Sequence, residues 1–283
     1  MFGVIGGSGF EKFDEFETIE LLDRETPFGL TASGFKKVRV NGQDLLFISR
    51  HGEHHEHLPS EINYRANIFA FKKMGVKAIL SFSAVGSLQK EFAPGDLVIP
   101  YQYIDRTKSI RAHTFLGQGL IGHVSLAKPI CEVMAEKVKA LVTLEKIDFK
   151  IHFGQTYVCI EGPYFSTKAE SDVYRQMKAD IIGMSNFPEY ALAREAGLPY
   201  LPLSFVTDYD CWDDSRPHVT VEEVIKVMHG NNAKAFTLLK IILKTNQIWT
   251  GSSALEGGLK TGLFMPSEAI PADKKAWVQT LMS

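Results

Sequence analysis

Two aspartates, Asp208 and Asp210, stand two residues apart at the end of the hydrophobic run Leu201–Thr207. Residues two apart in an extended chain face the same side, so both carboxylates can reach one ligand. A carboxylic acid can protonate a departing purine, and a carboxylate can accept a hydrogen bond from a 6-amino group, whereas an amide could donate to a 6-oxo group. The pair therefore favours adenine. A Ca²⁺ or Mg²⁺ site and a solvated strand end are the alternatives that this segment leaves open.

Three other turns carry groups that bind anions: Gly6-Gly7-Ser8-Gly9, Arg50-His51-Gly52 and Ser83-Ala84-Val85-Gly86-Ser87. Backbone N–H groups in a glycine turn can form a concavity for a phosphate, and an arginine fork could grip it in two places with the imidazole as a further donor. Taken singly, each is as well explained by a tight turn or a surface salt bridge. The glycine spacing in Gly6-Gly7-Ser8-Gly9 matches neither a dinucleotide-binding fingerprint nor a P-loop.

Two further segments, Ile160–Ser166 and Gly183–Glu189, are predicted turns between a strand and a helix. Phe165 could stack on a base, and the Met184-Ser185 turn could meet ribose and phosphate oxygens. In isolation such side chains more often belong to the core.

Four histidines lie close together in His51-Gly52-Glu53-His54-His55-Glu56-His57, which raises the question of a metal site. The spacing matches no helical metal-binding signature and Pro59 follows almost at once, so no metal is predicted. Phosphate donation by His51 and lining of a pocket by another of the histidines are the roles that we expect.

The elements that must position these residues alternate along the chain. Strands are predicted at Phe2–Ile5, Asp44–Ser49, Ala78–Ser83, Asp96–Pro100, Gln155–Ile160, Asp180–Met184 and Leu201–Thr207. Helices are predicted at Glu61–Met74, with Ser60 as N-cap and Gly75 as stop, and at Leu126–Leu141, Thr167–Met177, Pro188–Glu195 and Val221–Leu243. This order predicts an α/β fold with a central mixed or largely parallel sheet flanked by helices, and ligand sites at the strand ends.

Composition predicts one domain over residues 1–283, with an irregular or helical tail over 251–283. A net charge of −2 and the lack of a polybasic arm argue against a nucleic-acid partner, and no membrane partner is expected. Cys131, Cys159 and Cys211 are far apart and odd in number, which predicts buried thiols. The start Met1-Phe2-Gly3-Val4-Ile5 has no features of a secretory signal, so a cytoplasmic location is expected.

Six segments together resemble the trimeric purine nucleoside phosphorylase superfamily, specifically its methylthioadenosine branch. They are Ile5–Gly9, Arg50–Gly52, Asn63–Asn67, Ile160–Pro163, Met184–Glu189 and Thr207–Trp212. The resemblance implies a nucleoside phosphorylase fold and a pentosyltransferase that converts methylthioadenosine and phosphate to adenine and 5-methylthioribose 1-phosphate. Inorganic phosphate would be a co-substrate, and no cofactor or metal is expected.

The resemblance also implies residue roles. Asp208 would act as general acid at purine N7, Asp210 would read the 6-amino edge, Phe165 would contact the base and Met184 the ribose. The residues implied for phosphate are Ser8, Arg50, His51, Ser83, Ala84, Ser166 and Ser185.

The 5' end of the nucleoside would meet an apolar pocket formed by Val221 and Val224. His123 resembles a histidine that a neighbouring subunit lends to this pocket, with His55 nearby, so a homotrimer with shared sites is expected. Tyr164 departs from the arginine common in the family. A broader purine nucleoside or methylthioinosine phosphorylase is the alternative, and a non-catalytic nucleoside-binding protein is a distant one.

Overall fold

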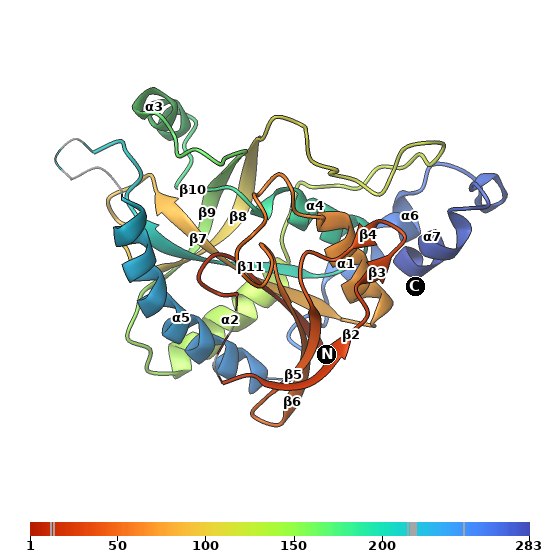
Figure 1. Cartoon of the computed structure of the whole chain (residues 1–283), viewed down its shortest axis with the longest axis horizontal. Coiled ribbons are helices and arrows are strands. Elements are labelled where there is room, and N and C mark those ends of the chain that lie inside the picture. Colours follow the sequence, from red (N-terminus) through yellow and green to blue (C-terminus); the bar gives the residue numbers. More distant parts are fainter. Residues whose placement is uncertain (12, 14, 214, 216–219, 246) are drawn as a thin grey trace.

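A mixed sheet forms the centre of the computed structural model, which describes residues 1–283 apart from positions 12, 14, 214, 216–219 and 246 and the side chain of residue 221 (Figure 1). Across the sheet the strands are β10 (Ile181–Gly183), β9 (Ile151–Ile160), β8 (Leu97–Arg106), β11 (Tyr200–Asp208), β7 (Ala78–Ser87), β1 (Phe2–Gly6), β6 (Gln43–Ser49), β5 (Phe35–Val40) and β2 (Glu17–Leu22). A separate short ribbon pairs β3 (Glu25–Thr26) with β4 (Gly29–Leu30).

Strand direction explains how distant turns meet. Strands β6, β1, β7 and β11 run parallel, so their carboxyl ends lie at the same edge of the sheet. Strand β10 pairs in parallel with β9 and antiparallel with β7, where Ile182 faces Gly86. Strands β7, β11, β8, β9 and β10 therefore close into a ring that brings the turn after β10 against the end of β7.

Helices cover both sides of the sheet (Figure 1). Helices α1 (Tyr64–Lys73) and α4 (Asn186–Glu195) pack together on one side, and α2 (Glu132–Leu144) and α5 (Val221–Leu243) pack together on the other. Helix α3 (Lys168–Gln176) lies at the far end from the tail. The α/β class and the mixed sheet flanked by helices are as the sequence predicts. In the part of the chain that the structure describes, no helix is long and apolar enough to span a membrane.

Two predicted helix starts are wrong for local reasons. The N-cap of α1 is Asn63, whose side chain accepts from the Ala66 N–H at 3.2 Å, so the cap lies three residues after the predicted cap Ser60 and the helix begins at Tyr64. Helix α2 begins at Glu132 and not at Leu126, since Pro129 interrupts the apolar pattern before it. Gly75, at φ +72°, ends α1 as predicted.

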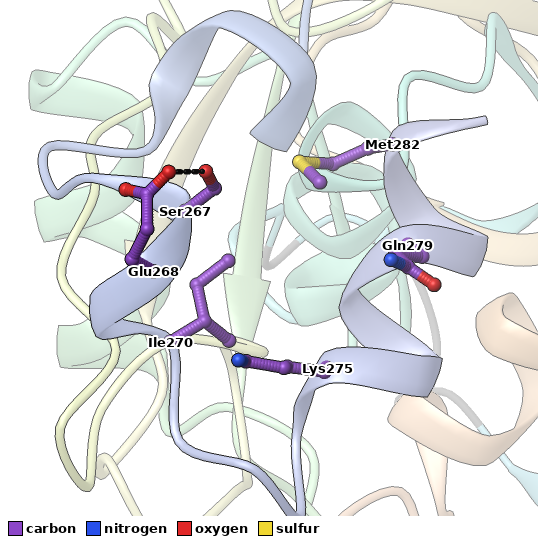
Figure 2. Close-up of a pocket in the computed structure, with 6 residues that line it drawn as sticks. All are labelled: Ser267, Glu268, Ile270, Lys275, Gln279 and Met282. Carbon is purple, nitrogen blue, oxygen red and sulfur yellow. Dashed lines mark hydrogen bonds between the residues drawn. The ribbon is translucent and has the colours of Figure 1, made fainter.

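The tail is mostly short helices: η1 (Ser253–Glu256), α6 (Leu259–Gly262), η2 (Ser267–Ala269) and α7 (Lys275–Met282). Helix α7 packs against α1, at the end of the molecule opposite α3 (Figure 1). Figure 2 shows a small cavity of about 260 Å³ between η2 and α7, lined by Ser267, Glu268, Ile270, Lys275, Gln279 and Met282. None of its lining residues belongs to the predicted site.

Candidate active site

A cavity of about 1050 Å³ lies at the strand-end edge of the sheet and gathers residues from every turn that the sequence singles out. The site residues predicted from the sequence that line it are Ser8, His51, His55, Ala84, Phe165, Ser166, Met184, Ser185, Asp208, Asp210 and Val224. Those that do not line it are Arg50, Ser83 and His123, while the side chain of Val221 lies outside the described residues. A ligand of nucleoside size plus a phosphate fits this volume.

Asp208 ends β11, and both of its carboxylate oxygens accept hydrogen bonds. Oδ2 accepts from the Thr207 hydroxyl at 2.7 Å, and Oδ1 accepts from the Asp210 N–H at 2.8 Å. Burial raises the pKa of Asp208 in spite of these two bonds, which favour the charged form. A carboxyl group with a raised pKa can carry a proton closer to neutrality, as a general acid must.

Asp210 follows in a left-handed conformation, at φ +52°. Its Oδ2 is buried without a hydrogen-bond partner among the described residues, and the side chain lines the cavity. The pKa of Asp210 is raised to about 6, mainly by burial; the nearby Ser171 hydroxyl opposes this shift and the neighbouring Asp208 carboxylate adds to it. An unpaired buried acceptor is costly, so a donor from a ligand would stabilise it.

The raised pKa of Asp210 predicts a pH-dependent stability. Because the folded pKa, about 6, is above the unfolded value, the folded state binds more protons between about pH 4 and 6, and stability falls as pH rises through this window. The wild type should lose about 2 kcal/mol of stability between pH 4 and 7 through this group, and Asp210→Asn is expected to abolish that loss. Urea unfolding of both proteins at the two pH values measures this difference, and identical pH slopes would contradict it.

Arg50 is fully buried and is held by Glu189 of α4 in a two-point ion pair. Nε and Nη2 lie 2.7 and 2.9 Å from the two carboxylate oxygens, while Nη2 also donates to the Ser81 hydroxyl and Nη1 to the Phe82 carbonyl. The predicted two-point contact of the guanidinium with phosphate is therefore wrong, because Nε and Nη2 already donate to Glu189 and Ser81. One Nη1 hydrogen remains beside the glycine turn. A Cβ on Gly7 would overlap Nη1, which explains why this turn has no side chain there.

His51 is also placed differently from its predicted donor role. Its Nδ1 lies 3.0 Å from the His57 carbonyl oxygen, and a carbonyl only accepts, so Nδ1 carries the hydrogen. Burial and the Arg50 charge lower the pKa of His51 to about 3, which keeps the ring neutral. The imidazole stacks on His55, whose Nδ1 lies 2.7 Å from Glu11. Nε2 of His51 is therefore an acceptor for a ligand in the cavity.

Serine hydroxyls that make no hydrogen bond to another described residue face the same cavity. The Ser166 hydroxyl is buried and has no partner among the described residues. Ser185 is the N-cap of α4 but makes no side-chain capping bond, so its hydroxyl can serve a ligand at a helix N-terminus. Ser83 differs, since its hydroxyl donates to Ser204 at 3.1 Å inside the sheet. Ser8 and Ala84 line the cavity as predicted.

Helix α5 supplies an apolar wall that includes Val224, Ile225 and Met228. The sequence predicted only Val224 of these three, although Met228 follows it at helical spacing. Asn232, one turn further, was also missed; its side chain donates to the Gly9 carbonyl at 2.8 Å and fixes the glycine turn.

His123 lies outside this chain's own cavity. It is exposed in the segment between β8 and α2, and its N–H donates to the Gly262 carbonyl of the tail at 2.8 Å. Phe165, in contrast, lines the cavity and is still 55% exposed, so a ligand can cover it. Among the described residues, no group of three or more His, Cys, Asp or Glu side chains is placed to hold a metal ion.

Comparison with known proteins agrees with this geometry. Residues 1–244 match the family model of the phosphorylase superfamily. S-methyl-5'-thioadenosine phosphorylase of Geobacter sulfurreducens is 40% identical over 273 residues, which cover 96% of this chain and 94% of that protein. The enzyme of the same name from Hyperthermus butylicus is 45% identical over 237 residues, covering 83% of this chain and 85% of that protein.

Two solved structures have the same fold. A methylthioadenosine phosphorylase from an antarctic soil metagenomic library superimposes with a TM-score of 0.90 at 41% identity, covering 100% of this chain and 98% of that one. Methylthioadenosine phosphorylase from Schistosoma mansoni in complex with adenine gives 0.81 at 33% identity, covering 86% and 90%. The chain belongs to the phosphorylase superfamily, and within it to the group of S-methyl-5'-thioadenosine phosphorylases.

Proposed function

We propose that the protein cleaves S-methyl-5'-thioadenosine with inorganic phosphate to give adenine and 5-methylthioribose 1-phosphate. The observation that carries the proposal is that one cavity joins two partly buried carboxylates, an apolar helix wall and turns that carry serine hydroxyls and backbone N–H groups. The carboxylates suit adenine, the wall suits a methylthio group and the turns suit phosphate. The names of the relatives support the same reaction.

The reaction breaks the C1'–N9 bond as the ribosyl group develops positive charge, and a phosphate oxygen then forms the new bond to C1'. Asp208 delivers a proton toward N7, so the base leaves without an added negative charge. The unpaired Oδ2 of Asp210 accepts from the 6-amino group. The protein's contribution is positioning and electrostatics, with no covalent intermediate and no cofactor in the reaction.

Phosphate binding is assigned to groups that face the cavity from several turns. The hydroxyls of Ser8, Ser166 and Ser185 and the backbone at Ala84 would donate directly. Arg50 would contribute the remaining Nη1 hydrogen and its positive charge. Ser83 would not contact phosphate through its hydroxyl, which donates to Ser204, and would support the turn that carries Ala84.

The tautomer of His51 predicts which anions bind. Because Nε2 accepts, the oxygen that meets it must carry a hydrogen, as a P–OH group of the singly or doubly charged phosphate ion does. Sulfate, which has no proton to donate at neutral pH, should therefore inhibit only weakly, with a Ki well above the KM for phosphate measured at saturating nucleoside. If sulfate competes as tightly as phosphate binds, His51 donates in the complex and the assignment is wrong.

Incubation of the protein with methylthioadenosine, with and without phosphate, tests the reaction. Adenine release that requires phosphate is expected. Release without phosphate would indicate a hydrolase, and binding without release would favour a non-catalytic nucleoside-binding protein. Methylthioinosine and adenosine in the same assay test the broader alternative. We expect methylthioadenosine to be preferred because Ile225 and Met228 add to the apolar wall beside Val224.

The exposed position of His123 supports a shared site. We expect a homotrimer in which this side chain reaches the 5' pocket of a neighbour, and a cytoplasmic enzyme. His123→Ala should then raise the nucleoside KM without changing the mass measured by light scattering. An unchanged KM would exclude the histidine from the pocket.

A further inference from the structure

Arg111, in the segment between β8 and α2, is a buried arginine that the proposed reaction does not use. Its side chain is 1% exposed, and its Nε lies 2.6 Å from Oε1 of Glu161. Nη1 donates to the Met184 carbonyl at 2.7 Å and the Phe187 carbonyl at 2.6 Å, and Nη2 donates to the Glu161 carbonyl at 2.9 Å.

These carbonyls belong to the two turns that hold the nucleoside half of the cavity. Glu161 opens the turn after β9 that carries Phe165, and Met184 lies in the turn after β10. Both turns line the cavity. The guanidinium therefore joins them directly and sets the gap across which a base and a ribose would lie.

The charge of Arg111 is balanced inside the protein. Glu161 is 5% exposed, and its second oxygen, Oε2, accepts from the Lys108 N–H at 2.7 Å. The Tyr64 ring lies 5.9 Å from the guanidinium carbon. The planar guanidinium has five N–H donors and can bind a carboxylate and carbonyls on both turns at once. The lysine ammonium has only three donors, all on one nitrogen atom.

We propose that Arg111 is a positioning residue for nucleoside binding, acting through the backbone of the Glu161 and Met184 turns. It touches no ligand itself. This rests on the proposed function, because the ligand that the two turns hold is the purine nucleoside. Phosphate depends on Arg111 only in part, through Ser166 and Ser185 of these two turns, since Ser8, His51 and Ala84 belong to other turns.

Three variants and one control test the proposal: Arg111→Met, Arg111→Lys and Glu161→Gln, with Arg194→Met as control. Arg194 also holds the segment between β8 and α2, by donating to the carbonyls of Ser125 and Lys128, but it contacts neither turn. The Arg111 variants are expected to raise the nucleoside KM about 10- to 100-fold. The phosphate KM should rise by a smaller factor than the nucleoside KM, and Arg194→Met should leave both near wild type.

Calorimetric binding of adenine keeps this test independent of turnover. If the wild type binds adenine but releases none from a nucleoside, the proposed function fails while the adenine affinity of the Arg111 variants still tests the positioning role. Folded Arg111 variants with wild-type adenine affinity would overturn the proposal. If neither Arg111 variant folds, Glu161→Gln decides. Its single acceptor oxygen cannot serve both Nε of Arg111 and the Lys108 N–H, so the guanidinium loses part of its anchor, and an unchanged nucleoside KM would overturn the proposal equally.

Discussion

Asp208→Ala is expected to lower kcat by a factor on the order of 10² to 10⁴, the usual contribution of a general acid. The carboxyl group is partly buried, and this burial raises its pKa, so it can hold the proton that the departing base needs. The loss should appear in kcat as well as in kcat/KM, because the proton transfer develops only in the transition state. Steady-state kinetics with methylthioadenosine at saturating phosphate measures it.

Asp208→Asn is the matched control for shape. Asparagine can still accept from the Asp210 N–H but cannot transfer a proton, so its kcat should be nearly as low as that of the alanine variant. Its amide can donate to a 6-oxo group, which should shift the remaining preference away from 6-aminopurines. Normal turnover by either variant would refute the role of Asp208 and would direct attention to Asp210, whose pKa is also raised.

Glu189→Gln is expected to destabilise the protein by about 3–5 kcal/mol, because it leaves the Arg50 charge buried without its partner. Glu189 is 1% exposed, and its Oε1 also accepts from the Tyr200 hydroxyl at 2.7 Å. In a chain of this size the change corresponds to a fall in Tm on the order of 10 °C. Differential scanning calorimetry measures it, and the phosphate KM should rise in the same variant as Arg50 moves.

Two further variants separate this effect from a general cost of removing a carboxylate. Lys128, which precedes α2, and Glu132, the first residue of α2, form an ion pair at 2.9 Å with side chains 69% and 32% exposed, so Glu132→Gln should change stability by less than about 1 kcal/mol. The double variant Arg50→Met with Glu189→Met removes both charges and should be more stable than Glu189→Gln alone. A Glu189→Gln protein that melts with the wild type would show that the buried pair contributes little.

The turns of the active site could be predicted because each follows an apolar run, and parallel strands bring such turns to one edge. This worked for Ser8, Ala84 and Asp208. The position of Met184 was also predicted, although β10 is short, because the segment Met184–Glu189 resembles the family on its own. The ring closure between β10 and β7 was not predictable, since it depends on a pairing of strands far apart in the sequence.

The partners of the buried charges could not be predicted for a different reason. Nothing in one sequence distinguishes a charge that will be buried and paired from one on the surface, so Glu161, Glu189 and Arg111 were missed as a group. Only Glu189 could have been found from the sequence, because it closes the segment Met184–Glu189 that resembles the family. The edge strand β2 was missed because nearly every residue in it is exposed, with Leu21 at 70%, which leaves no apolar face to read.

The closeness of Gly7 to Arg50 also constrains how this protein can evolve. A side chain at position 7 would occupy the place of Nη1, and the displaced guanidinium would leave the Glu189 carboxylate alone in the interior. The three positions, distant in sequence, cannot change one at a time without passing through a poorly folded intermediate. Descendants of this sequence should therefore keep all three residues or exchange them together.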